Sequence, residues 1–198
     1  MKGKHIIRFF VVLVIFLLWL WLVRDNNARW NESMEGRRIG KEYSIGEIVP
    51  LGDSIVNMQT LEGCSVKVSS FEIVDYDRFL EEHHFVIENP YEISYEKLGI
   101  VYLTIESDDV DVAGFPLSGL RITSLDSCQY IDHAVLFACN PFLEGKPSVS
   151  LEHHSSIDLI LPFDLFYDSL QADWNRLDKI SIYLRITSNP EVINIKIQ

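Results

Sequence analysis

The chain has 198 residues, of which 29 are acidic and 17 are Lys or Arg, so its formal net charge is −12. Residues 24–198 contain fourteen of the basic residues and all of the acidic ones, which gives this part a net charge of −15. A surface this acidic repels phosphate backbones and anionic lipid head groups, so we expect no nucleic-acid partner.

The N-terminus carries an apolar run, Phe9–Val23, behind a short head that holds Lys2, Lys4 and Arg8. Counted as residues 6–23, the segment gives roughly 27 Å of helix, close to the hydrocarbon core of about 30 Å. A cleaved secretory signal and a buried core helix are the alternatives. The first needs a small-x-small processing site and the second a polar face, and the sequence favours neither. We therefore predict a membrane partner for residues 6–23 as an uncleaved anchor.

The orientation of this anchor follows from the length of what comes after it. Long domains translocate largely regardless of charge, and a basic head before an apolar run is typical of signal-anchors. We expect a single-pass protein of the cell membrane, with residues 1–23 as cytoplasmic head and anchor. Residues 24–42 are polar and of mixed charge, which indicates a stalk, and residues 43–198 form the extracytoplasmic domain.

From Tyr43 onward, short runs of β-forming residues alternate with turn residues. One of them changes phase between Val68 and Phe71, which a β-bulge explains. The predicted strands are Ser44–Val49, Ser54–Met58, Cys64–Val74, His83–Ile87, Gly99–Ser107, Leu120–Ser124, Gln129–Ala138, Ser148–Glu152, Ser156–Leu161, Lys179–Thr187 and Val192–Ile197.

The segment Asp164–Asp178 has a helical pattern instead. Leu170, Trp174 and Leu177 fall on one helix face, and Asp164 is placed to act as N-cap. The domain is therefore predicted to be all-β, an antiparallel sandwich with one short helix, because no β-α-β alternation supports a parallel sheet.

This pattern resembles a known family. The segments YSIGEIVPLGDSIVNM, CSVKVSSFEIVD, GIVYLTIES, SSIDLILPFDLF and KISIYLRIT are similar to the telokin-like, immunoglobulin-like extracytoplasmic domains of Gram-positive bacteria. The resemblance implies an immunoglobulin-like sandwich on a bacterial surface protein and supplies no catalytic residues. The chain departs from the lipid-anchored members because no cysteine follows its apolar segment.

Four histidines are candidate metal ligands, because imidazole and nearby carboxylates bind transition metals. They form the pairs His83-His84 and His153-His154, each next to Glu residues. Adjacent residues on a strand point to opposite faces, so only one histidine of each pair can reach a shared site. The alternative is that all four are exposed at strand edges or in loops.

Three carboxylates, Asp108, Asp109 and Asp111, suggest weak calcium binding or a solvated acidic turn. An EF-hand needs alternate ligands through twelve residues and a closing Glu, which this segment lacks.

The cysteines leave two readings open. Cys128 and Cys139 lie eleven residues apart and can form a disulfide or stay reduced and buried, with Cys64 as a free core thiol.

No catalytic motif is present, so we expect neither enzyme activity nor a cofactor. The leading prediction is a membrane-anchored extracytoplasmic binding module whose partner is another extracytoplasmic protein or an envelope component. An envelope structural or assembly component and a metal-binding surface domain remain the alternatives.

Overall fold

The computed structural model describes residues 40–52, 55–56, 59–87, 96–108, 110–124, 127–165, 177, 179–187 and 192–198. A compact unit extends from Gly40 to Gln198. The predicted anchor at 6–23 lies outside the described ranges, and within them no helix is long and apolar enough to span a membrane.

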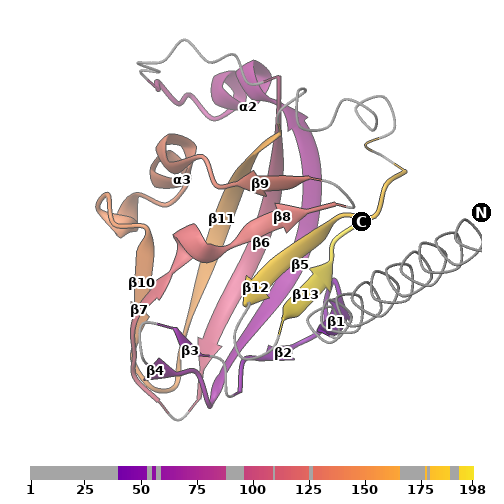
Figure 1. The fold of residues 1–198 in the computed structure, drawn as a ribbon. Helices are drawn as coiled ribbons and strands as arrows, with labels where there is room; N and C mark the ends of the chain where they lie inside the picture. Colours follow the sequence, from indigo (N-terminus) through magenta and orange to yellow (C-terminus); the bar gives the residue numbers. More distant parts are fainter. Residues whose placement is uncertain are drawn as a thin grey trace, which may run out of the picture. The chain divides into compact units, whose positions relative to one another are not determined.

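Three long strands, side by side in Figure 1, form the centre of the first sheet. They are β5 (Cys64–Asp75), β6 (Lys97–Ser107) and β11 (Ser155–Leu165). Both β5 and β11 pair antiparallel with β6 along its whole length, and the short β2 (Val49–Pro50) completes the order β11-β6-β5-β2. The register between β5 and β6 shifts between Val68 and Ser70, which confirms the predicted β-bulge.

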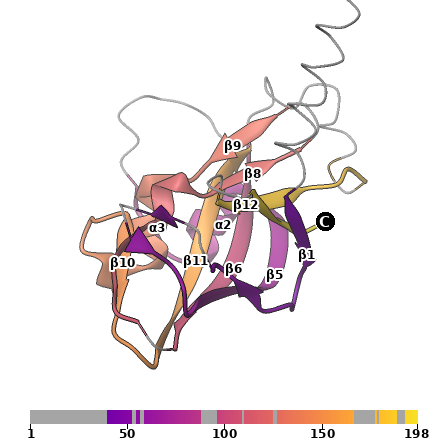
Figure 2. The same ribbon diagram turned by 60° about the horizontal axis from the view of Figure 1, so that its bottom comes forward.

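The second sheet has the order β1-β13-β12-β8-β9, with β1 at its edge (Figure 2). Adjacent strands of this sheet pair antiparallel, except that β1 runs parallel to β13. The strands are β1 (Lys41–Ser44), β13 (Ile193–Lys196), β12 (Tyr183–Thr187), β8 (Arg121–Thr123) and β9 (Cys128–Tyr130). Two small sheets pair β10 (Ser148–Leu151) with β7 (Val112–Pro116) and β3 (Ile55–Val56) with β4 (Gln59–Thr60).

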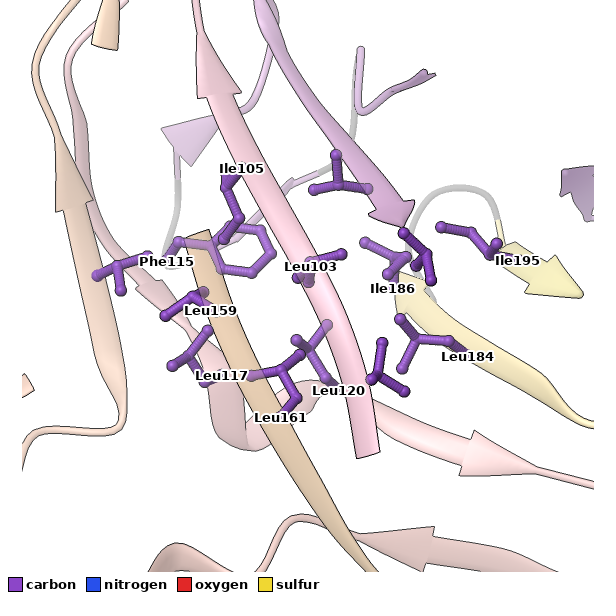
Figure 3. Packing of buried hydrophobic residues seen from close by; sticks show 14 of the residues in the cluster. Leu103, Ile105, Phe115, Leu117, Leu120, Leu159, Leu161, Leu184, Ile186 and Ile195 are labelled. Carbon is purple, nitrogen blue, oxygen red and sulfur yellow. The ribbon is translucent and has the colours of Figure 1, made fainter. Parts of the chain in front are cut away.

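The apolar core lies between the two main sheets and is built from residues at alternate strand positions (Figure 3). Leu103 and Ile105 of β6 lie beside Leu159 of β11, while Leu184 and Ile195 come from β12 and β13. These side chains are no more than 2% exposed. The predicted β-sandwich is therefore confirmed.

The outer face of the first sheet is partly covered by two short helices, α2 (Tyr76–Glu82) and α3 (His133–Cys139). They share an apolar cluster with β6, in which Tyr76 and Phe79 of α2 and Val135 of α3 meet Leu98 and Ile100. Two 3₁₀ turns complete the described helical elements, η1 (Leu117–Gly119) and η2 (Pro141–Leu143).

Two predicted strands were wrong because local capping favours helix. In place of a strand at His83–Ile87, His83 ends α2, which Asp75 begins by accepting a hydrogen bond from the Arg78 N–H at 3.1 Å. In place of one strand at Gln129–Ala138, β9 stops at Tyr130 and Asp132 begins α3. A short apolar run such as AVLFA fits either structure by periodicity alone.

The predicted helix at Asp164–Asp178 does not begin where its pattern indicated. Asp164 is not an N-cap, because it lies in β11 opposite Leu98 of β6. Leu177 is buried against Leu165. Leu170 and Trp174 lie outside the described residues. At the other end of the domain, Lys41 and Glu42, the last residues of the predicted stalk, belong to β1.

Candidate binding site beside helix α2

An open groove lies on the described surface where the chain turns back after α2. The chain reverses through a Schellman motif, in which Phe85 N–H donates to the Leu80 carbonyl at 2.9 Å and His84 N–H donates to the Glu81 carbonyl at 3.2 Å. His84 takes the left-handed conformation that this motif requires, with φ of 57°. The reversal places residues 85–87 alongside the helix.

An aromatic stack fixes the base of this reversal. The rings of Phe79 and His83 have centroids 4.4 Å apart, and those of His83 and Phe85 lie 5.5 Å apart in a stacked arrangement. Phe79 is only 4% exposed and packs on the outer face of the sheet. The stack therefore connects the surface segment to the cluster beneath α2.

The resulting groove has a volume of about 590 Å³. Its lining combines apolar side chains with two carboxylates and one imidazole: Asp77, Leu80, Glu81, His84, Phe85 and Val86. Val86 is 95% exposed, so it contributes nearly all of its apolar side chain to the surface of the groove. The groove offers an apolar surface bordered by negative charge.

The two carboxylates of the groove lie one helical turn apart and repel each other. Asp77 and Glu81 stand at i and i+4, where like charges destabilise a helix by a few tenths of a kcal/mol. Within the described part of the chain, neither has a cationic partner, because Arg78 instead bonds Glu82 at 2.7 Å. That contact raises the pKa of the Arg78 guanidinium, through the hydrogen bond first and the charge of Glu82 second.

The candidate metal ligands are separated by the fold. His83 and His84 follow α2, beside the start of β6, whereas the turn that contains His153 and His154 lies beside its end. With eleven residues in β6, these positions are about 30 Å apart. The two pairs therefore do not share one site.

The structure does bring one histidine to the acidic turn. Asp111 Oδ1 accepts from the His153 backbone N–H at 2.8 Å and lies 3.1 Å from its Nδ1, and both contacts lower the pKa of the Asp111 carboxyl. His154 N–H donates to the Asp108 carbonyl at 3.0 Å. Asp109 lies outside the described residues. Among those described, no group of three His, Cys, Asp or Glu side chains is arranged to bind a metal ion.

The three cysteines are free thiols. Cys128 begins β9 and Cys139 ends α3, so the segment between them is a strand and a helix rather than a tight excursion. Burial, followed by the charge of Asp132, raises the pKa of the Cys139 thiol to about 12. Cys64 is buried in the core, and burial is the main cause that raises its thiol pKa.

Sequence reasoning missed the groove and a second feature, a pair of buried aspartates. The available signals were the helical spacing of Tyr76, Phe79 and Leu80 and an aspartate just before each short helix. The aspartate pair, Asp132 and Asp164, joins residues 32 positions apart, which no local pattern predicts.

Comparison with known proteins identifies a family. The model described as "Domain of unknown function (DUF5028)" matches residues 40–193. Curated proteins give no match.

Solved structures with a similar arrangement share little sequence. A secreted protein from Mycobacterium tuberculosis, MPT63, is 11% identical with a TM-score of 0.46, covering 79% of this chain and 97% of its own. The yjhA protein from Bacillus subtilis is 11% identical with a TM-score of 0.43, over 79% and 99% of the two chains. An uncharacterized β-sandwich protein from Clostridium difficile 630 is 10% identical with a TM-score of 0.38, over 80% and 96%.

Proposed function

We propose that this chain, which belongs to the DUF5028 family, is a membrane-anchored extracytoplasmic module. It binds a protein partner through the groove beside α2. Residues 6–23 hold the chain in the membrane as a single-pass anchor, with the N-terminus cytoplasmic. The sandwich, which resembles telokin-like extracytoplasmic domains, stands outside. Its acidic surface suits a domain that stays clear of anionic head groups.

The observation that carries the proposal is the combination of exposed apolar surface and unpaired negative charge in the groove. Val86 is 95% exposed and is the most exposed large apolar side chain among the described residues. Exposed apolar surface edged by polar groups is typical of interaction sites. Asp77 and Glu81 flank it without a described cation to balance them.

The chemistry of the partner follows from this lining. A Lys or Arg side chain placed between Asp77 and Glu81 removes their mutual repulsion, and an adjacent apolar side chain buries Val86. Residues 43–198 carry a net charge of −16, which steers a basic segment towards the domain. We therefore assign the groove to a basic and apolar peptide segment of a partner protein.

The assignment is tested by measuring the binding of three synthetic peptides of equal length to the full chain by fluorescence anisotropy. One alternates Lys with Leu, one Glu with Leu and one Lys with Ser. We expect only the Lys–Leu peptide to bind appreciably, because only it matches both the charge and the apolar surface. Val86→Glu and Glu81→Lys should each weaken its binding about tenfold or more, the loss of about 1.4 kcal/mol.

Matched controls come from the same chain. Ile48 is 61% exposed and lies before β2, and Glu152 is exposed in the turn before β11. Ile48→Glu and Glu152→Lys make the same changes elsewhere and should leave binding unchanged. Equal binding of the Lys–Ser peptide, or equal effects of the control variants, would contradict the proposal.

The location is tested separately on intact cells. The full-length protein should remain in the membrane fraction, and external protease should remove the domain, because the proposal places residues 43–198 outside. A domain protected until the cells are lysed, or a processed form released to the medium, would contradict this part of the proposal.

A further inference from the structure

Two aspartates meet in a buried contact between α3 and β11. Asp132 is the N-cap of α3, and Asp164 stands on the outer face of the first sheet, opposite Leu98 of β6. Each residue is only 8% exposed. The backbone bridge between Ile131 and Phe163 and the bond from Asp132 N–H to the Pro162 carbonyl set Asp132 beside Asp164, so the two carboxyl groups are neighbours. Two buried carboxyl groups this close are accommodated when one of them carries a proton, which it can donate to the other.

The surrounding contacts indicate which group carries it. Asp132 Oδ1 accepts from the backbone N–H groups of Ala134 at 2.8 Å and Val135 at 3.0 Å, a role that suits a carboxylate. Asp164 Oδ1 is buried without a hydrogen-bond partner. A charged Asp164 would leave this oxygen uncompensated, so the proton belongs on Asp164.

The other titratable groups nearby leave this arrangement in place. Asp75 and Lys97 form the next register row, whose side chains point to the opposite face of the sheet. On the elements packed against Asp164, the titratable groups are Asp132, His133 and Cys139 of α3, Tyr76 of α2 and Glu96 before β6. Of these, Asp132 is the group that acts on Asp164. Burial first, and then the charge and hydrogen bond of Asp132, raise the pKa of Asp164 to about 8.

We propose that the Asp132–Asp164 pair is a proton-dependent latch that holds the start of α3 against β11 and releases it when Asp164 ionises. Asp132 N–H also donates to the Pro162 carbonyl at 3.0 Å, so the latch and this bond together fix the helix on the strand. Val135, whose N–H the same carboxylate holds, packs in the cluster that also contains Phe79. Release of α3 therefore loosens the support beneath α2.

The direction of the pH effect follows from linkage. An aspartate in an unfolded chain has a pKa of about 3.9. In the folded chain, burial and the neighbouring Asp132 raise the pKa of Asp164 to about 8. Between these values the folded chain keeps a proton that the unfolded chain has lost, so stability falls as the pH rises from about 4 to about 8. Above the upper value, the folded chain holds two adjacent buried carboxylates.

The test compares the full chain with Asp164→Asn between pH 5 and pH 9. The amide that this substitution introduces can donate to Asp132 without titrating. The variant should therefore lose much of the fall in Tm that the wild type shows over this range, a difference of several degrees at pH 9. Asp158→Asn is the control, because Asp158 lies on the same strand face, accepts from Thr104 Oγ1 at 2.7 Å and belongs to an exposed pair.

Hydrogen exchange gives the local readout. After correction for intrinsic exchange rates, the amides of Ala134 and Val135 should lose protection above pH 8 in the wild type and in Asp158→Asn, but keep it in Asp164→Asn. A wild-type pH profile that Asp164→Asn reproduces, in either Tm or exchange, would overturn the latch. A groove that binds no peptide would leave this result unaffected, because neither readout depends on a partner.

Discussion

His84 shows how one residue shapes the candidate site through its backbone rather than its imidazole. It occupies the left-handed position of the Schellman motif that ends α2, with φ of 57°, where glycine is the usual residue. A side chain in this conformation costs about 1–2 kcal/mol relative to the ordinary helical region. The reversal that forms the groove is therefore held against a local preference by the packing of Phe85.

Relieving this strain should stabilise the protein. We predict that His84→Gly raises the free energy of unfolding by about 0.5–1 kcal/mol, because glycine adopts φ of 57° without a steric penalty. Urea unfolding of the full chain followed by circular dichroism measures the change. The control is His133→Gly at the first residue of α3, where φ is not positive and glycine only adds freedom to the unfolded chain, so it should lower stability. A loss of stability in His84→Gly would mean that its imidazole contributes more than the strain removes.

The histidine pairs also show what residue types alone can predict. Their identity suggested metal chemistry, yet within the described residues their positions are turns, with His84 and His154 both at positive φ. The Asp111–His153 contact joins residues 42 apart, and its formation depends on the pairing of β7 with β10, in which Val112 lies opposite Leu151. Local sequence carries no information about such a contact.

Among the elements, α3 covers the edge of β11, although the sequence pattern predicted part of a strand, Gln129–Ala138, at this place in the chain. The Asn140 side chain, which is 2% exposed, replaces a neighbouring strand: its Nδ2 donates to the Ile160 carbonyl at 2.7 Å and its Oδ1 accepts from Ile160 N–H at 3.0 Å. Pro162 has no N–H, so it leaves no unsatisfied donor at this edge. The edge is thus covered by α3 and its caps, which protects the strand from pairing with other chains.

The elements that sequence predicted best are those with the longest periodic patterns. The alternation in β6 and β11 and the phase change in β5 gave their positions and the bulge. The helices α2 and α3 have seven residues each, too few for a helical period to outweigh an apolar run. Their capping residues, Asp75 and Asp132, were the available signals, but aspartates are common in so acidic a chain.

At the scale of the whole molecule, the sandwich class was predictable because burial of one face of each strand fixes the two-layer arrangement. The candidate site was not, since it depends on how two short helices pack on the outer face. The start of the domain was not predictable either, because the sequence pattern begins at Tyr43. The structure includes Lys41 and Glu42 in β1, whose pairing with β13 is parallel and joins the two ends of the domain.

This pairing leads to a prediction about independent folding. A chain of residues 40–198 should be soluble and unfold in one cooperative step, because it contains both sheets and the core.

A chain of residues 45–198 loses the ladder from Lys41 to Ser44 and the packing of Tyr43 on the core, and leaves the edge of β13 open. We expect it to be less stable by about 2–4 kcal/mol, the sum of one partly buried aromatic side chain and the lost hydrogen bonds. Urea unfolding of both chains, followed by far-ultraviolet circular dichroism, measures the difference. As a control, shortening by the two C-terminal residues removes the buried Ile197, whose N–H donates to the Ile182 carbonyl, and Gln198, whose carbonyl accepts from Ile182 N–H. This change should also destabilise. Equal stability of the 40–198 and 45–198 chains would show that the domain is complete without β1 and that its parallel pairing contributes nothing to the fold.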